Sequence, residues 1–95
     1  MFTLIAPPGF LRQARKFLDR HPELRPRFTA LLDTLRRDPF HPALKLHALG
    51  GKLSGCHAVT LTHSPHVTLT ILISAKEITL LAIAFQAIIH RAQES

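Results

Sequence analysis

The spacing of apolar residues changes from a helical repeat to a strand repeat near residue 56, and this change constrains the fold more than any other feature. Before it, apolar residues recur every three or four positions, as in amphipathic helices. After it, they alternate with small polar residues and β-branched residues are frequent, as in strands. This order predicts an α+β fold, with a helical layer packed on one face of a mainly antiparallel sheet.

Two helices are predicted in the first half, and prolines set their limits. The first begins after Pro7 and ends near Arg20, because Pro22 disfavours helical geometry in the residue before it. The second covers residues 24–35 and ends at residues 38–39, an Asp-Pro step. Only a very short turn separates them, so we expect a helical hairpin.

The remaining elements are predicted to be strands. An apolar segment at residues 2–6 is expected to form an edge strand before the hairpin. Residues 39–56, which are rich in proline and glycine, read as a loop with one short strand at about residues 44–47. Three longer strands, joined by turns short enough for antiparallel hairpins, are expected at residues 57–62, 66–73 and 77–84. The predicted order is strand, helix, helix and then three or four strands, that is β-α-α-β-β-β when the short strand is left out. Residues 86–93 form either a closing helix or a frayed tail.

Alternation gives the predicted sheet two different faces. In the strand at residues 66–73, the polar residues His66, Thr68 and Thr70 point to one face. The apolar residues point to the other face, namely Val67, Leu69, Ile71 and Ile73. The apolar face is suited to docking the two helices. The polar face is either a functional groove or an ordinary solvated face of an antiparallel sheet.

Positive charge is concentrated in the first half of the chain. Residues 1–52 hold ten basic and four acidic residues, whereas the rest of the chain has no net charge, so the whole chain carries +6. Such a distribution favours a polyanionic partner, either nucleic acid or an acidic protein. The alternative is that the arginines simply solvate the outer faces of two helices.

Size and composition predict one cytoplasmic domain. Ninety-five residues, of which 46% are hydrophobic, supply one core, so we expect a single domain over residues 1–95. The longest apolar stretch, residues 78–89, is shorter than the roughly 20 residues of a membrane span, and no cationic leader precedes the first apolar residues. Cys56 is the single cysteine, which excludes an intramolecular disulfide and a cysteine-based zinc cluster. No membrane partner is expected.

The chain has seven histidines, but their spacing does not predict a metal site. No two of them form a helical pair four residues apart, and His63 and His66 merely flank a proline turn. Cys56 and His57 point to opposite faces because they are adjacent in a strand, so they do not form a catalytic pair. We therefore expect no metal and no cofactor, and we expect Cys56 to be a small core residue.

The order of elements and one turn resemble a known family. The stretch Leu46-His47-Ala48-Leu49-Gly50-Gly51-Lys52-Leu53-Ser54-Gly55, which follows Asp38-Pro39, resembles the RelE/ParE superfamily of toxins from bacterial type II toxin–antitoxin modules. The resemblance extends over nearly the whole chain. It is closest to the YafQ-like branch of ribosome-dependent mRNA endonucleases, whose members often carry a histidine where His47 stands. It implies a RelE-like α+β domain, a basic surface for ribosomal RNA and mRNA, and a cognate antitoxin that wraps the toxin into a hetero-oligomer.

The same resemblance implies a candidate site. His47 and His66 are expected to transfer protons and Lys45 and Lys52 to contact phosphate, because they lie on the turn and the strand start that line the active groove in these families. Two further candidates for RNA or phosphate contacts are Arg36 and Arg37. An RNase of this kind needs a base, an acid and cations near the reacting phosphate.

One departure from the family pattern leaves the activity open. The last strand of RelE-like nucleases normally delivers a histidine, and this chain is expected to have Phe85 at that position. The protein is therefore either an mRNA endonuclease or a catalytically degenerate relative. The alternative is a non-enzymatic binder, either a ParE-like gyrase poison or an inactive toxin homologue that acts through complexes with antitoxin and DNA. A basic structural domain without toxin ancestry is the third interpretation.

Overall fold

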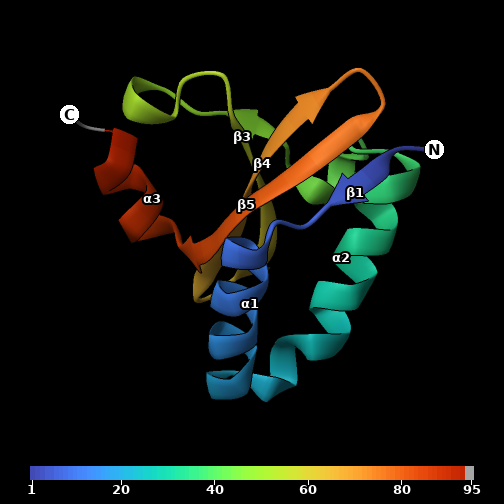
Figure 1. Cartoon of the computed structure of the whole chain (residues 1–95). Coiled ribbons are helices and arrows are strands. Elements are labelled where there is room, and N and C mark those ends of the chain that lie inside the picture. Colours follow the sequence, from blue (N-terminus) through green and yellow to red (C-terminus); the bar gives the residue numbers. More distant parts are fainter. Residues whose placement is uncertain (94–95) are drawn as a thin grey trace.

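The computed structural model describes residues 1–93, and its elements follow the predicted order (Figure 1). The helices and strands are β1 (Thr3–Ile5), α1 (Pro8–Arg20), α2 (Arg25–Arg37), β2 (His47–Ala48), β3 (His57–His63), β4 (His66–Ser74), β5 (Glu77–Phe85) and α3 (Gln86–Gln93). Three short 3-10 turns complete the chain, namely η1 (Pro22–Leu24), η2 (Pro42–Leu44) and η3 (Gly51–Leu53). The predicted α+β class is confirmed, and the tail at residues 86–93 is a helix.

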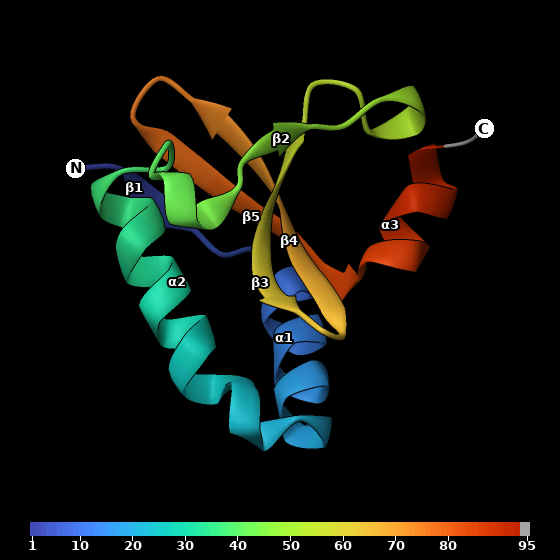
Figure 2. The ribbon, with the colours of Figure 1, turned by 180° about the vertical axis from the view of Figure 1, so that it is seen from behind.

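The predicted helical hairpin is present, and prolines limit it as expected. Both helices have a proline in the first turn, where its missing N–H costs no hydrogen bond. The turn η1 joins them, and α2 ends at Arg37 because Asp38 is already extended ahead of Pro39. Figure 2 shows the two helices diverging from this turn toward the sheet.

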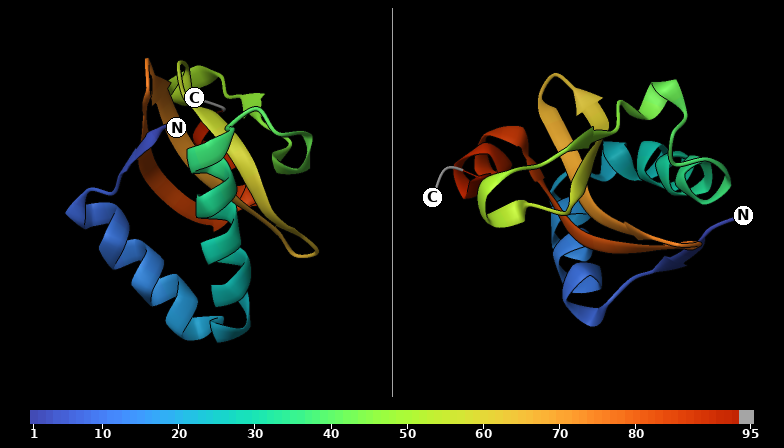
Figure 3. Two further views of the ribbon diagram at one scale, coloured as in Figure 1. Left: turned by 90° about the vertical axis from the view of Figure 1, so that its right-hand side faces the viewer. Right: turned by 90° about the horizontal axis from the view of Figure 1, so that it is seen from above.

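The sheet has the strand order β1-β5-β4-β3-β2 and is mainly antiparallel, as predicted. The one parallel pair joins β1 to β5, where Thr3–Ile5 aligns with residues 77–79. In the described part of the chain, the rest of β5, from Leu80 to Phe85, therefore has no strand neighbour on its outer side. The predicted edge position of the first strand is confirmed, and the chain leaves it directly for α1 (Figure 3).

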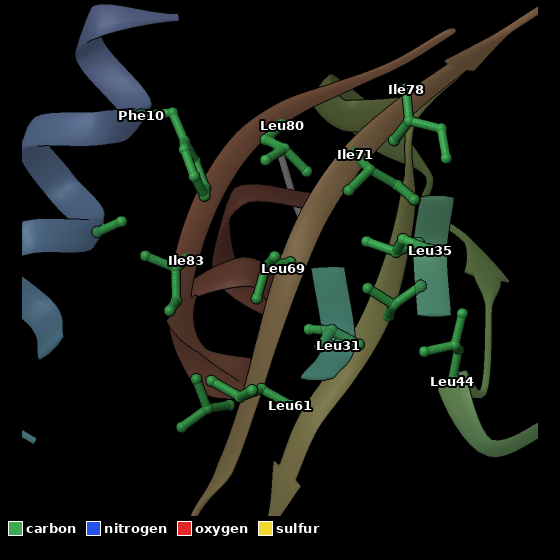
Figure 4. Packing of buried hydrophobic residues seen from close by; sticks show 13 residues of the cluster. Phe10, Leu31, Leu35, Leu44, Leu61, Leu69, Ile71, Ile78, Leu80 and Ile83 are labelled. Carbon is green, nitrogen blue, oxygen red and sulfur yellow. The ribbon is translucent and has the colours of Figure 1, made fainter. Parts of the chain in front are cut away.

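The core lies between the helical hairpin and one face of the sheet (Figure 4). The helices contribute Phe10, Ala14, Leu31 and Leu35, and the strands contribute Val59, Leu61, Val67, Leu69, Ile71, Ile78, Leu80 and Ile83. Burial of each large side chain stabilises the fold by about 1.5–3 kcal/mol, so this face anchors the domain. Val67, Leu69 and Ile71 are core residues and Ile73 packs against them, as the alternation predicted for the apolar face.

A smaller cluster covers part of the opposite face. Leu49 from the segment before η3, Ala58 of β3 and Ile89 of α3 are all buried there. Leu53, Cys56 and Ala84 pack against them, so Cys56, predicted to be a small core residue, is half-buried at the edge of this smaller cluster. Figures 1 and 2 both show η3 and α3 close together at one end of the sheet.

The short strand predicted at about residues 44–47 is present, but it begins only at His47 and runs to Ala48. Pro42 begins the turn η2, the side chain of His41 accepts a hydrogen bond from the backbone N–H of Ala43 at 3.1 Å, and Lys45 adopts a left-handed conformation. These features turn the backbone, so pairing begins only at His47. Among the helices of residues 1–93, none has the length and apolarity to cross a membrane.

Candidate functional site

The sheet face opposite the two-helix layer carries the polar residues that the alternation predicted. His47 pairs with Ala58, which pairs with Thr70, and the next row along the face joins Thr60 to Thr68. Directly paired residues place their side chains on the same face. We call this surface the polar face and define it as His47, Ala58, Thr60, His66, Thr68, Thr70, Ala82 and Ala84.

The middle of the polar face is buried. Thr68 is 0% exposed and Thr70 is 2% exposed, and neither hydroxyl has a hydrogen-bond partner among the described residues. A buried hydroxyl without a partner costs roughly 1–3 kcal/mol, and such groups are rare in native proteins. The interpretation of this face as an ordinary solvated one is therefore wrong at these two positions, because α3 and residues 49–53 cover part of it.

His47 lies at one end of the polar face and is exposed. Its ring Nδ1 lies 3.0 Å from the backbone carbonyl oxygen of Lys45. A carbonyl oxygen only accepts, so Nδ1 carries the proton and donates it. In the neutral ring, Nε2 is then free to accept a proton, which suits a general base. The left-handed backbone at Lys45 ends η2 just before the strand that carries this histidine.

His66 lies at the other end, where the β3–β4 hairpin turns. It pairs with His63, and their rings are stacked with centroids 6.3 Å apart. Inside the hairpin, the hydroxyl of Thr62 donates to the carbonyl oxygen of Pro65, which fixes the turn. Both histidines are exposed, so an incoming ligand has access to either ring.

The two predicted proton-transfer residues do not form a close pair. His47 is level with Thr70, two strands away, and His66 is four residues earlier on the strand of Thr70. Strand spacing and rise place their Cα atoms about 16 Å apart. They flank the polar face at its two ends, with small hydroxyl and methyl side chains between them.

The structure does not bring the predicted phosphate-binding residues together. Lys45 lies two residues before His47, and Lys52 lies in η3, five residues after it. Both side chains are exposed. Arg36 and Arg37 lie at the end of α2, whose core residues pack on the other side of the sheet. Both of these guanidinium groups bind the carboxylate of Asp33, at 3.1 and 3.2 Å.

Phe85 is not part of the polar face. Its ring packs against Phe17 at 5.7 Å and His21 at 6.0 Å, on the α1 side of the sheet. The next residue, Gln86, begins α3, and its Oε1 is buried without a hydrogen-bond partner in the described chain. Sequence reasoning missed Gln86, although a polar residue directly after an apolar strand was the available signal.

The described residues offer little for a metal ion. Within residues 1–93, no group of three or more histidine, cysteine, aspartate or glutamate side chains is arranged to hold one. The chemistry that the polar face offers is that of imidazoles, hydroxyls and nearby ammonium groups.

Comparison with solved structures identifies the fold. A copper-bound point mutant of a toxin from Helicobacter pylori matches with a TM-score of 0.73 and 25% identity, covering 92% of this chain and 97% of that one. YafQ from Escherichia coli matches with a TM-score of 0.76 and 17% identity, covering 93% and 97%. The Staphylococcus aureus YoeB–YefM complex matches with a TM-score of 0.70 and 14% identity, covering 90% and 97%. No family model and no curated protein matches the chain.

The chain thus has the small α+β fold of these toxins. The predicted RelE/ParE-type fold, with its closeness to YafQ, is confirmed over nearly the whole chain.

Proposed function

We propose that this protein is a type II toxin that acts in the cytoplasm as a ribosome-dependent mRNA endonuclease. The observation that carries the proposal is the shared toxin fold, with an exposed histidine at each end of its polar face. The cationic first half of the chain supports a ribosomal substrate, because contacts between cations and RNA phosphates release counterions and thereby favour binding.

The proposal assigns to individual residues the roles that the family resemblance implies. His47 accepts the proton of the 2′-hydroxyl through its free Nε2. His66 supplies a proton to the leaving oxygen after the substrate draws its ring toward His47, because the Cα atoms of the two residues are about 16 Å apart in this conformation. Lys52 and Lys45 neutralise phosphate near the polar face. The polar face must adapt around the substrate, because Thr68 and Thr70 are covered in this conformation.

The experiment is induction of the chain alone in a bacterial host, together with mapping of mRNA ends. The wild type should arrest growth and cleave messages in the ribosomal A site. His47→Ala and His66→Ala should each lower cleavage at least tenfold, since general acid–base groups contribute roughly 100- to 10,000-fold. Lys76→Ala, an exposed cation outside the cationic first half, is the matched control. Intact messages during a normal growth curve would exclude the nuclease.

A second function is favoured by the composition of the polar face. Between its two histidines this face carries only threonines and alanines, and Phe85 points to the other side. These residues suit a surface that binds rather than cleaves. Growth arrest with intact mRNA and inhibited DNA supercoiling would support a ParE-like gyrase poison. Absence of arrest, with retained antitoxin and operator binding, would support an inactive homologue.

We also propose an acidic, partly disordered antitoxin as the partner. The Staphylococcus aureus YoeB–YefM structure and the Escherichia coli DinJ–YafQ structure are toxin–antitoxin complexes of those proteins. The exposed arginines of α1 and α2 and the edge strand β1 are suited to such a segment. Co-expression with a small acidic protein encoded beside this gene should abolish the arrest and yield a stable complex. A basic domain without toxin ancestry would have no such neighbour.

A further inference from the structure

His63 and His66 stand opposite each other at the end of the β3–β4 hairpin. They are directly paired across the two strands, and only Ser64 and Pro65 separate them in the chain. Directly paired residues place their side chains on the same face of a sheet, with Cβ atoms about 4.5–5.5 Å apart. The hydroxyl of Thr62 donates to the carbonyl oxygen of Pro65, which fixes the turn and so holds the two histidines opposite each other.

The distance between the two rings suits a shared metal ion. Their centroids are 6.3 Å apart, and their planes are inclined by 22°. A zinc ion lies about 2.0–2.1 Å from an imidazole nitrogen, which places the ring centroid about 3.2 Å from the ion. Two rings on one ion then have centroids about 5.2 Å apart in a tetrahedral arrangement and about 6.4 Å apart in a linear one. The observed separation lies in this range, so rotation of the side chains is the main change that binding requires.

Both rings are available to a ligand. Each side chain is exposed, and within residues 1–93 neither ring forms a hydrogen bond or an ion pair. Neutral imidazole is a common ligand of Zn²⁺, Cu²⁺ and Ni²⁺, whereas Mg²⁺ and Ca²⁺ prefer oxygen. Glu23 and Arg27 line the cavity beside His63, and their opposite charges largely offset each other for a cation at the hairpin.

The pair is suited to an exchangeable ion rather than a structural one. Structural zinc sites have four protein ligands, and the described part of the chain has no group of three or more metal-ligating side chains. Two histidines therefore leave the other positions around the ion to water. The spacing of the histidines along the sequence does not reveal this pair, because the hairpin brings them together across two strands.

We propose that His63 and His66 together bind one divalent transition-metal ion at the tip of the β3–β4 hairpin. One nitrogen of each neutral ring donates its lone pair to the ion. A bound ion also keeps the lone pair of His66 from carrying a proton, so it inhibits RNA cleavage. This second consequence rests on the proposed function, whereas binding of the ion does not.

The test uses the purified full chain without an affinity tag, and Zn²⁺ alone is the probe. Calorimetry gives the stoichiometry and the dissociation constant, and NMR follows the ring resonances of each histidine. We expect one zinc ion per chain, with the rings of His63 and His66 shifting together and no such shift with Mg²⁺. His63→Ala and His66→Ala should each weaken binding at least tenfold. His41→Ala, which removes an exposed histidine elsewhere, should weaken it less than threefold.

The double variant His63→Ala/His66→Ala separates one shared ion from two independent ions. If both rings bind the same ion, loss of either ring removes most of the affinity, so the double variant should bind at most threefold more weakly than either single variant. Two zinc ions per chain, a shift confined to one of the two rings, or equal weakening by His41→Ala would overturn the proposal.

A cleavage assay with and without Zn²⁺ tests the inhibition, and the ratio of the two rates is compared within each variant. Zinc should lower cleavage by the wild type at least tenfold and cleavage by His63→Ala less than threefold. Undiminished wild-type cleavage at saturating zinc would overturn the inhibition. Zinc binding by both rings in a chain that cleaves no RNA would support the metal site and contradict the nuclease function, so the two proposals fail separately.

Discussion

The Oε1 atom of Gln13 accepts a hydrogen bond from the backbone N–H of Ile83, 70 residues later in the chain, at 2.9 Å. This contact joins α1 to the outer edge of β5, which no strand of residues 1–93 covers beyond Thr79. A side chain can leave such a bond more readily than a paired strand can, because only its own rotamers have to change. The backbone N–H of Ile83 thus has a hydrogen-bond acceptor in the free protein, and this edge of the sheet remains available to a partner.

We predict that Gln13→Ala exposes the Ile83 amide with little loss of stability. The loss of one intramolecular hydrogen bond costs about 0.5–1.5 kcal/mol. Hydrogen exchange at Ile83 should therefore become faster, whereas exchange at the core residue Leu69 should follow only the change in global stability. Amide exchange by NMR and urea denaturation measure the two quantities. Unchanged protection at Ile83 would show that another group covers this amide.

We predict that Thr68→Val and Thr70→Val each stabilise the protein by about 1 kcal/mol, because each removes a buried hydroxyl that has no partner in the described chain. Valine keeps the shape and the strand propensity of threonine. Thr62→Val is the matched control: this buried hydroxyl donates to Pro65, so the same change should destabilise. Urea denaturation gives the free energies. Lower stability in the first two variants would indicate a hidden partner, such as a bound water.

Activity assays of the same valine variants probe the polar face. If the hydroxyls contact substrate after the covering segments move, the more stable variants should cleave RNA more slowly. A gain in stability combined with a loss of activity is typical of functional positions. Equal activity would limit the role of the threonines to the fold.

We predict that Phe85→His does not raise RNA cleavage and lowers stability by about 1–2 kcal/mol. The new imidazole would lie on the α1 side, against Phe17 and His21, and would lose aromatic packing there. Phe85→Leu is the control that keeps an apolar side chain at this position. Thermal denaturation and mRNA end mapping provide the readouts. Restored cleavage would mean that the end of β5 rotates in the active protein, so that the side chain at position 85 lies on the polar face.

Most of the fold could be predicted from local patterns. The prolines that limit α1 and α2 act through neighbouring residues, and the alternation from Val67 to Ile71 identifies the core face without any knowledge of the partner strands. Lys45 shows where this fails. Its left-handed backbone ends η2 and delays the next strand, and no residue type other than glycine predicts such a conformation well.

The site was harder to predict, because its burial depends on contacts distant in sequence. Thr68 and Thr70 look like solvent-facing strand residues until Leu49 and Ile89 pack together over that side of the sheet. The face of Phe85 likewise depends on its cross-strand partner Val67, which lies in the core. The family resemblance pointed to position 85 in the chain, but it did not predict which face of the sheet the side chain of Phe85 would occupy.

The last prediction concerns the attachment of α3. Ile89 is 5% exposed and packs with Leu49 and Ala58, whereas its neighbour Ile88 is 53% exposed. An eight-residue helix is too short to be stable alone, so this contact holds it in place. Ile89→Ala should therefore release α3 by local unfolding, while Ile88→Ala, the same change one residue earlier, should leave it attached.

Hydrogen exchange and far-UV circular dichroism distinguish the two variants. In Ile89→Ala the amides of α3 should lose protection while those of β4 keep theirs, because the main core does not include this helix. Helical signal should fall by an amount consistent with α3 alone. The hydroxyls of Thr68 and Thr70 would then reach water, and RNA should bind the opened polar face more tightly at low salt than at high salt. Cooperative unfolding of the whole chain in Ile89→Ala would instead make α3 an integral part of the fold.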